Sequence, residues 1–93
     1  MFTAFTMIQT DPDRVSEIAQ KIAESPNVAE VYSVTGEWDI IAIIRIHEYD
    51  QLDEVVPNTL GKLQGIRRTN TILAFRRFSA KDLAWDVGAQ AEG

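Results

Sequence analysis

A nearly continuous apolar segment, Trp38 to Ile46, most constrains how this chain can fold. Its central residues, Ile40 to Ile44, carry no polar side chain, whereas a strand with one face in water alternates apolar and polar residues. We therefore expect a strand that is covered on both faces. Helices of the same chain can cover one face. A chain of 93 residues has no further layer for the other, so the sequence predicts a dimer in which two sheets pack against each other.

Three more strands and two helices are expected around this segment. Phe2 to Gln9, Val28 to Thr35 and Thr69 to Phe78 are rich in β-branched and aromatic residues, which favour strands. Between the strands, two segments carry apolar residues at helical spacing. They are Val15, Ile18, Ala19, Ile22 and Ala23 in the first, and Leu52, Val55, Val56, Leu60 and Leu63 in the second.

Capping and breaking residues predict where the helices begin and end. Asp11 and Asp50 are candidate N-caps, and Pro12 suits a first helical position. Pro57 lies inside the second apolar pattern and should kink or split that helix. Gly65 is expected to end it.

The resulting order, βαββαβ, predicts an α+β fold, a ferredoxin-like sandwich of the dimeric α+β barrel type. A tight hairpin at Gly36 would join its two halves. We expect residues 1–78 to form this domain and residues 79–93 to form a C-terminal tail. In that tail, Trp85 is expected to dock on the body or on a neighbouring subunit, and the last residues are expected to be disordered.

Composition argues against several classes of function. The formal net charge is -5 and the pI is near 4.7, so direct binding to a nucleic acid backbone is disfavoured. The chain has no cysteine, which excludes disulfides and thiolate chemistry. Its start shows no signal peptide, and its longest apolar run is too short to span a membrane. We therefore expect a cytoplasmic protein.

Two sequence motifs carry a resemblance to a known family. The run V-Y-S-V-T-G-E-W-D-I-I-A-I-I, from Val31 to Ile44, resembles the effector-binding domain of the Lrp/AsnC regulators. Gly65-Ile66 followed by Thr69-x-Thr71 also resembles that domain. The first expected strand begins at Met1 or Phe2, so the resemblance is to stand-alone members without a helix-turn-helix DNA-binding domain.

The resemblance implies a regulatory, non-enzymatic module that binds a small-molecule effector, which we expect to be an amino acid. It also implies dimers that assemble further into an octamer or decamer. Output would pass through that assembly or through a full-length Lrp/AsnC regulator.

The leading candidate ligand site is the turn made by Thr35, Gly36, Glu37, Trp38 and Asp39. Glycine permits a sharp turn, and successive backbone N–H groups in such a turn can converge on an anion. An amino acid offers a carboxylate to those groups and an ammonium to Asp39. The resemblance places ligand at this turn, between dimers. The alternative is an ordinary hairpin in which Asp39 accepts local backbone N–H bonds.

Thr69, Asn70 and Thr71 are a second set of candidate ligand contacts, supplied by another subunit. Their alternative role is that of ordinary strand residues. The arginine pairs at positions 67–68 and 76–77 are expected to form salt bridges with neighbouring carboxylates. His47 is the only histidine and has no cysteine to join it, so no metal site and no cofactor are expected.

Two other functions compete with effector sensing. A small dimeric α+β barrel enzyme, such as a monooxygenase, would need a polar pocket, for which His47, Tyr32 and Trp38 are the available residues. A ligand-free assembly adaptor would need none. Amino-acid-binding ACT domains share the element order and are a related alternative.

Overall fold

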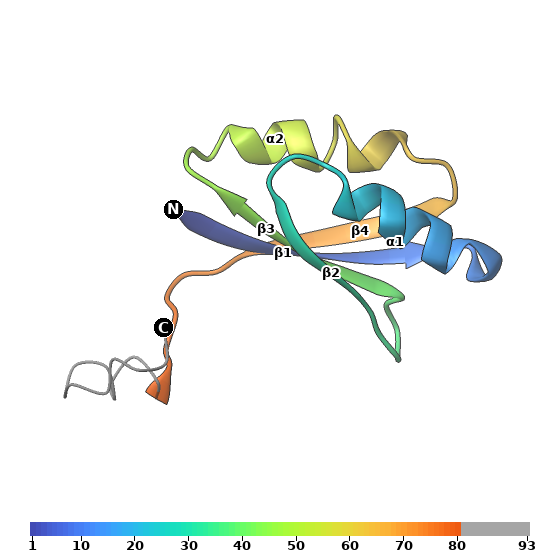
Figure 1. Cartoon of the computed structure of the whole chain (residues 1–93), viewed down its shortest axis with the longest axis horizontal. Helices are drawn as coiled ribbons and strands as arrows, with labels where there is room; N and C mark the ends of the chain where they lie inside the picture. Colours follow the sequence, from blue (N-terminus) through green and yellow to red (C-terminus); the bar gives the residue numbers. More distant parts are fainter. Residues whose placement is uncertain (81–93) are drawn as a thin grey trace.

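The computed structural model describes residues 1–80 and places two helices on one face of a four-stranded sheet (Figure 1). The strands run in the order β2-β3-β1-β4, and all neighbouring pairs are antiparallel. This topology confirms the predicted α+β, βαββαβ ferredoxin-like fold. The elements are β1 (Phe2–Thr10), the 3₁₀ helix η1 (Pro12–Arg14), α1 (Val15–Ala23), β2 (Val28–Ser33), β3 (Ile40–Ile46), α2 (Gln51–Val55), the 3₁₀ helix η2 (Leu60–Lys62) and β4 (Ile66–Leu73).

The hydrophobic core lies between the sheet and the helices. On β1 and β3 every second side chain is fully buried, and the register pairs Ala4 with Ile44 and Ile8 with Ile40. Directly paired residues of antiparallel strands point to the same face, so these side chains meet α1 and α2 together. The buried apolar residues are Ala4, Ile8, Ile18, Ile22, Ile40, Ala42, Ile44, Ile46, Val55 and Leu60.

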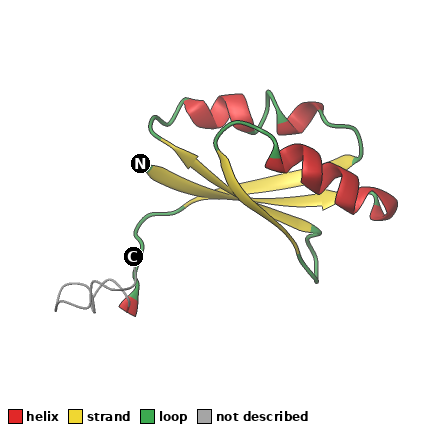
Figure 2. Ribbon diagram, in the orientation of Figure 1, coloured by secondary structure: helices red, strands yellow, loops and turns green. Residues whose placement is uncertain are grey.

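The other face of the sheet, which we call the open face, carries the intervening side chains. It includes Phe5, Met7, Ile41 and Ile43, which are half-buried, and Ile72, which is 52% exposed. Within residues 1–80, no helix covers it, and the chain after β4 leaves the sheet on this side (Figure 2). The predicted apolar strand is thus β3, and the helices cover one of its faces as expected, whereas the cover expected for its other face would have to come from a second chain.

Several predicted boundaries were wrong. β2 ends at Ser33, β3 begins at Ile40 rather than Trp38, and β4 spans Ile66–Leu73 rather than 69–78. The hairpin at Gly36 is therefore a six-residue connection, not a tight turn. Residues 81–93, with Trp85 and the rest of the expected tail, lie outside the described part of the chain.

Asp11 and Asp50 occupy the predicted N-cap positions, of η1 and α2, but neither side chain makes a capping hydrogen bond. The Asp11 carboxylate makes no capping bond and instead accepts a hydrogen bond from Arg67. Asp50 has helical backbone angles and no capping bond. The Gln51 side chain instead fixes the loop before α2, because its Oε1 accepts the N–H groups of His47 and Glu48 at 2.6 and 2.9 Å.

Pro57 splits the second helical segment as predicted. α2 ends at Val55, and the chain resumes as a 3₁₀ turn over Leu60–Lys62. Both parts still contribute to the core, since Val55 and Leu60 are buried. Gly65 does not end a helix directly but forms the bend into β4, with φ +97°.

We expect Gly65→Ala to lower the free energy of unfolding by about 1–3 kcal/mol. Alanine is strained at φ +97°, and its Cβ would lie 2.9 Å from Ile18 Cδ1 and 3.1 Å from Arg14 Cδ. Gly61→Ala is the matched control, because its Cβ would meet only the Val56 carbonyl oxygen at an ordinary 3.5 Å. Urea unfolding of both variants measures the difference. Equal stability of the two would contradict a requirement for glycine at 65.

Candidate ligand site at the β2–β3 turn

The predicted site turn is a solvent-facing loop fixed at its base. We call residues 34–39 the β2–β3 turn. The Val34 N–H donates to the Asp39 carbonyl oxygen, and the Asp39 N–H donates to the Ile8 carbonyl oxygen, each at 2.9 Å. Gly36 sits at the tip with φ +108° and no other group near its Cα hydrogen. The positive φ explains the glycine, because other residues rarely adopt it.

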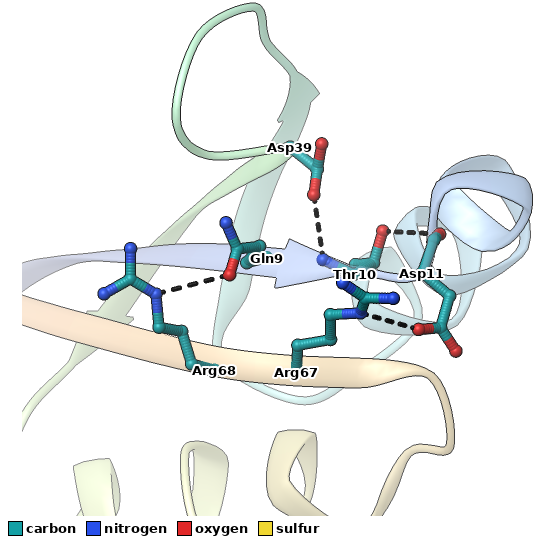
Figure 3. Close-up of polar contacts among 6 residues, drawn as sticks. All are labelled: Gln9, Thr10, Asp11, Asp39, Arg67 and Arg68. Atoms are coloured by element: carbon teal, nitrogen blue, oxygen red, sulfur yellow. Dashed lines mark hydrogen bonds and ion pairs between the residues drawn. The ribbon is translucent and has the colours of Figure 1, made fainter.

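Asp39 anchors the end of β1. Its Oδ2 accepts the Thr10 N–H at 2.9 Å, and the Thr10 hydroxyl donates to the Asp11 carbonyl oxygen (Figure 3). The carboxylate therefore completes backbone hydrogen bonding where the ladder between β1 and β3 stops. The structural alternative expected for Asp39 was a bond to local N–H groups of the hairpin, whereas the N–H that it accepts lies 29 residues away on β1. The Thr10 N–H thus occupies one of the two carboxylate oxygens of Asp39.

The rest of the turn offers unpaired backbone donors. Within residues 1–80, the N–H groups of Thr35, Gly36, Glu37 and Trp38 donate to no protein acceptor. Thr35, Gly36 and Glu37 are exposed, so water satisfies these groups in the single chain. A short run of such donors is suited to an anionic ligand group.

Arg68 of β4 lies directly against this turn, a contact that sequence reasoning missed. Its Nη2 donates to Glu37 Oε2 at 2.5 Å, and its guanidinium carbon lies 4.5 Å from the centre of the Trp38 ring. Its Nε also donates to Gln9 Oε1 at 3.4 Å. Figure 3 shows Arg68 and Gln9 reaching toward each other from β4 and β1.

The predicted salt bridges of the first arginine pair are confirmed. Arg67 Nε donates to Asp11 Oδ1 at 2.9 Å, which links β4 to the loop after β1, and Arg68 pairs with Glu37. The sequence indicated the type of contact but not the partner. The partners follow from the pairing of β1 with β4, which holds both arginines, and with β3, which follows the turn that holds Glu37.

Thr69, Asn70 and Thr71 lie further along β4 and split between the two faces. Thr71 Oγ1 is 2.9 Å from Thr6 Oγ1 on the helix side, and Thr69 pairs with Ile8 on the same face. Asn70 pairs with Met7 on the open face. Within one described chain no hydrogen bond links any of the three to the β2–β3 turn, so a joint site would require another subunit.

Other chemistries have little support among residues 1–80. No group of three or more His, Asp or Glu residues there is arranged to hold a metal ion. No helix in the same region is long and apolar enough to cross a membrane. On the open face, Tyr32 donates its hydroxyl hydrogen to Glu30 at 2.9 Å, and this carboxylate raises the pKa of Tyr32.

These features define a class: a ferredoxin-like α+β domain of the type found in dimeric α+β barrels, with a polar turn at one end of its sheet. The family follows from comparison with known proteins. The family model of the Lrp/AsnC ligand binding domain matches residues 3–83. The chain belongs to the Lrp/AsnC family, as the two sequence motifs predicted.

Individual relatives agree with this assignment. An HTH-type transcriptional regulator from Pyrococcus furiosus is 37% identical over 76 residues, which cover 78% of this chain and 51% of that protein. TTHA0845 from Thermus thermophilus is 46% identical in its crystal structure, with a TM-score of 0.81 over 85% of this chain and 99% of that one. The chain spans about half the length of the curated relatives it matches.

The fold is also shared with a regulator whose crystal structure contains a bound amino acid. The transcriptional regulator NMB0573 from Neisseria meningitidis, in complex with L-methionine, has a TM-score of 0.75 and 18% identity. The match covers 84% of this chain and 52% of that one. At this identity the likeness supports the fold alone.

Proposed function

We propose that this protein is an effector-binding regulatory domain that senses a small metabolite, an amino acid, through its β2–β3 turn. The observation that carries the proposal is the run of unpaired N–H groups at Thr35 to Trp38 beside the Asp39 carboxylate. An amino acid presents complementary groups, a carboxylate for the donors and an ammonium for the second Asp39 oxygen. Membership of the Lrp/AsnC ligand binding domain family adds support for a small-molecule ligand.

The site is completed by association. The uncovered apolar side chains of the open face favour a dimer through facing sheets. Association of dimers into an octamer or decamer would bring Thr69, Asn70 and Thr71 of one subunit near the turn of another. A ligand at that contact stabilises the assembly in which it makes more contacts, and so shifts the equilibrium toward it.

The output follows from the family. The relatives are transcriptional regulators, so we infer that this domain acts in the cytoplasm on transcription, through its own assembly or by joining a full-length Lrp/AsnC regulator. It would need no nucleic acid contact of its own, in keeping with its net charge of -5.

An enzymatic function is disfavoured because the candidate catalytic residues lie far apart. Tyr32 pairs with Ile41 near one end of β3, whereas His47 follows the other end. Six residues of strand separate these positions by about 20 Å. Trp38 is engaged by Arg68. The three do not form one polar pocket, so a regulatory rather than catalytic role is the better proposal.

Calorimetric titration with the twenty amino acids tests this function. We expect at least one to bind, and Asp39→Asn to weaken it about tenfold or more, because the ammonium loses a charged partner. Asparagine retains an oxygen for the Thr10 N–H, so the turn should stay folded. Asp53→Asn, an exposed change on α2, is the matched control. Failure of all twenty to bind would overturn amino-acid sensing.

A further inference from the structure

The Arg68–Glu37 ion pair joins the two parts of the chain that flank the candidate site. Glu37 belongs to the β2–β3 turn, and Arg68 precedes Thr69 on β4. Among the described residues, Glu37 is the only carboxylate that contacts Arg68. The Glu37 carboxylate is thus already paired with the Arg68 guanidinium, next to the unpaired N–H groups of the β2–β3 turn.

The guanidinium is held in place independently of Glu37. It stacks on Trp38 at 4.5 Å, and Gln9 accepts its Nε–H. Gln9 also donates from Nε2 to the Glu37 carbonyl oxygen at 3.2 Å. Stacking on an aromatic face and a planar fork of donors are properties of arginine that lysine lacks. Removal of the Glu37 carboxylate therefore leaves a positioned anion receptor.

The ion pair is also easily exchanged. The Arg68 and Glu37 side chains are 51% and 67% exposed, and pairs of this kind contribute little because water screens them. A ligand carboxylate on Arg68 would replace one charge-assisted hydrogen bond with another. It would gain the nearby turn N–H groups in addition, so the exchange can favour the ligand.

We propose that Arg68 is the carboxylate receptor of the effector site and that Glu37 is its intramolecular competitor, occupying the guanidinium until ligand displaces it. This inference rests on the proposed function and adds the residue that selects for a carboxylate. Displacement releases Glu37 from β4 and so couples binding to the position of the β2–β3 turn. Empty and occupied sites then differ in the surface that the turn presents to a neighbouring subunit.

The test is calorimetric titration of Glu37→Gln and Arg68→Gln with the amino acid that binds the unaltered protein most tightly. Glu37→Gln should tighten binding about two- to fivefold, because the competitor loses its charge. The gain should shrink as salt is added. Arg68→Gln should weaken binding at least about tenfold. Glu24→Gln, at the exposed end of α1, removes the same charge away from the site.

The carboxamide of the same amino acid separates competition from general electrostatics. It has no carboxylate to place on Arg68, so Glu37→Gln should give it no gain. Unchanged or weakened amino-acid binding in Glu37→Gln, with binding intact in the unaltered protein, would overturn this inference and leave amino-acid sensing standing. An equal gain for the carboxamide or for Glu24→Gln would also overturn it. Absence of binding in every protein would remove the proposed function and this inference with it.

Discussion

Ile44→Ala is expected to lower the free energy of unfolding by about 2–5 kcal/mol. Ile44 lies near the middle of β3, is fully buried, and pairs with Ala4 on the helix side of the sheet. Alanine removes three carbons from a site surrounded by β1, β2 and the helices, and Ala4 opposite is too small to fill the space. A domain of this size is marginally stable, so the loss is a large part of the total.

Urea unfolding at one fixed protein concentration measures this change, since association contributes to apparent stability. Ile44→Val is the graded control and should cost about 0.5–1.5 kcal/mol, because only one carbon is lost. Similar stability of the alanine and valine variants would show that the side chain is not packed as the structure has it.

The fold was predictable because its main determinants are periodic in the sequence. The alternation along β1 and the apolar run of β3 indicated which strands are central, and Pro57 correctly marked the break between α2 and η2. Boundaries were less predictable. Trp38 and Phe75 are good strand residues, yet both lie outside strands, because each is one residue beyond the last backbone bond to β1, made by Asp39 and Ala74 respectively.

Helix caps and the contacts of the site depend on tertiary geometry. Asp11 and Asp50 occupy N-cap positions, as local preferences predicted, but neither side chain makes a capping bond, and Arg67 engages the Asp11 carboxylate. The contact of Arg68 with the turn could not be predicted from the sequence for a related reason. Arg68 lies 31 residues from Glu37, and the pairing of β1 with both β3 and β4 brings the two together. The glycine turn was visible in the sequence; its partner on another strand was not.

Ile43→Asp is expected to dissociate the proposed dimer while leaving each chain folded. Ile43 faces away from the helices, on the open face, where it lines a hollow of about 400 Å³ with Phe5 and Phe78. In the single chain an aspartate there would meet water. In a dimer with twofold symmetry, two such carboxylates would be removed from water, a cost that the arginines lining the same hollow, Arg45, Arg76 and Arg77, offset only in part. We expect a cost above about 3 kcal/mol, more than a hundredfold in the dimer Kd.

Sedimentation equilibrium across a range of concentrations measures the dissociation, and circular dichroism reports whether the chain remains folded. Asn58→Asp adds the same charge at an exposed position after α2 and should leave association unchanged. The contrast with Ile44 is the essential point: these adjacent isoleucines point to opposite faces of the sheet, Ile44 to the core of the chain and Ile43 to the proposed contact between chains. Ile43→Asp that remains dimeric, or an unaltered protein that is monomeric, would contradict association through the open face. The turn would then have to bind its ligand without a second subunit.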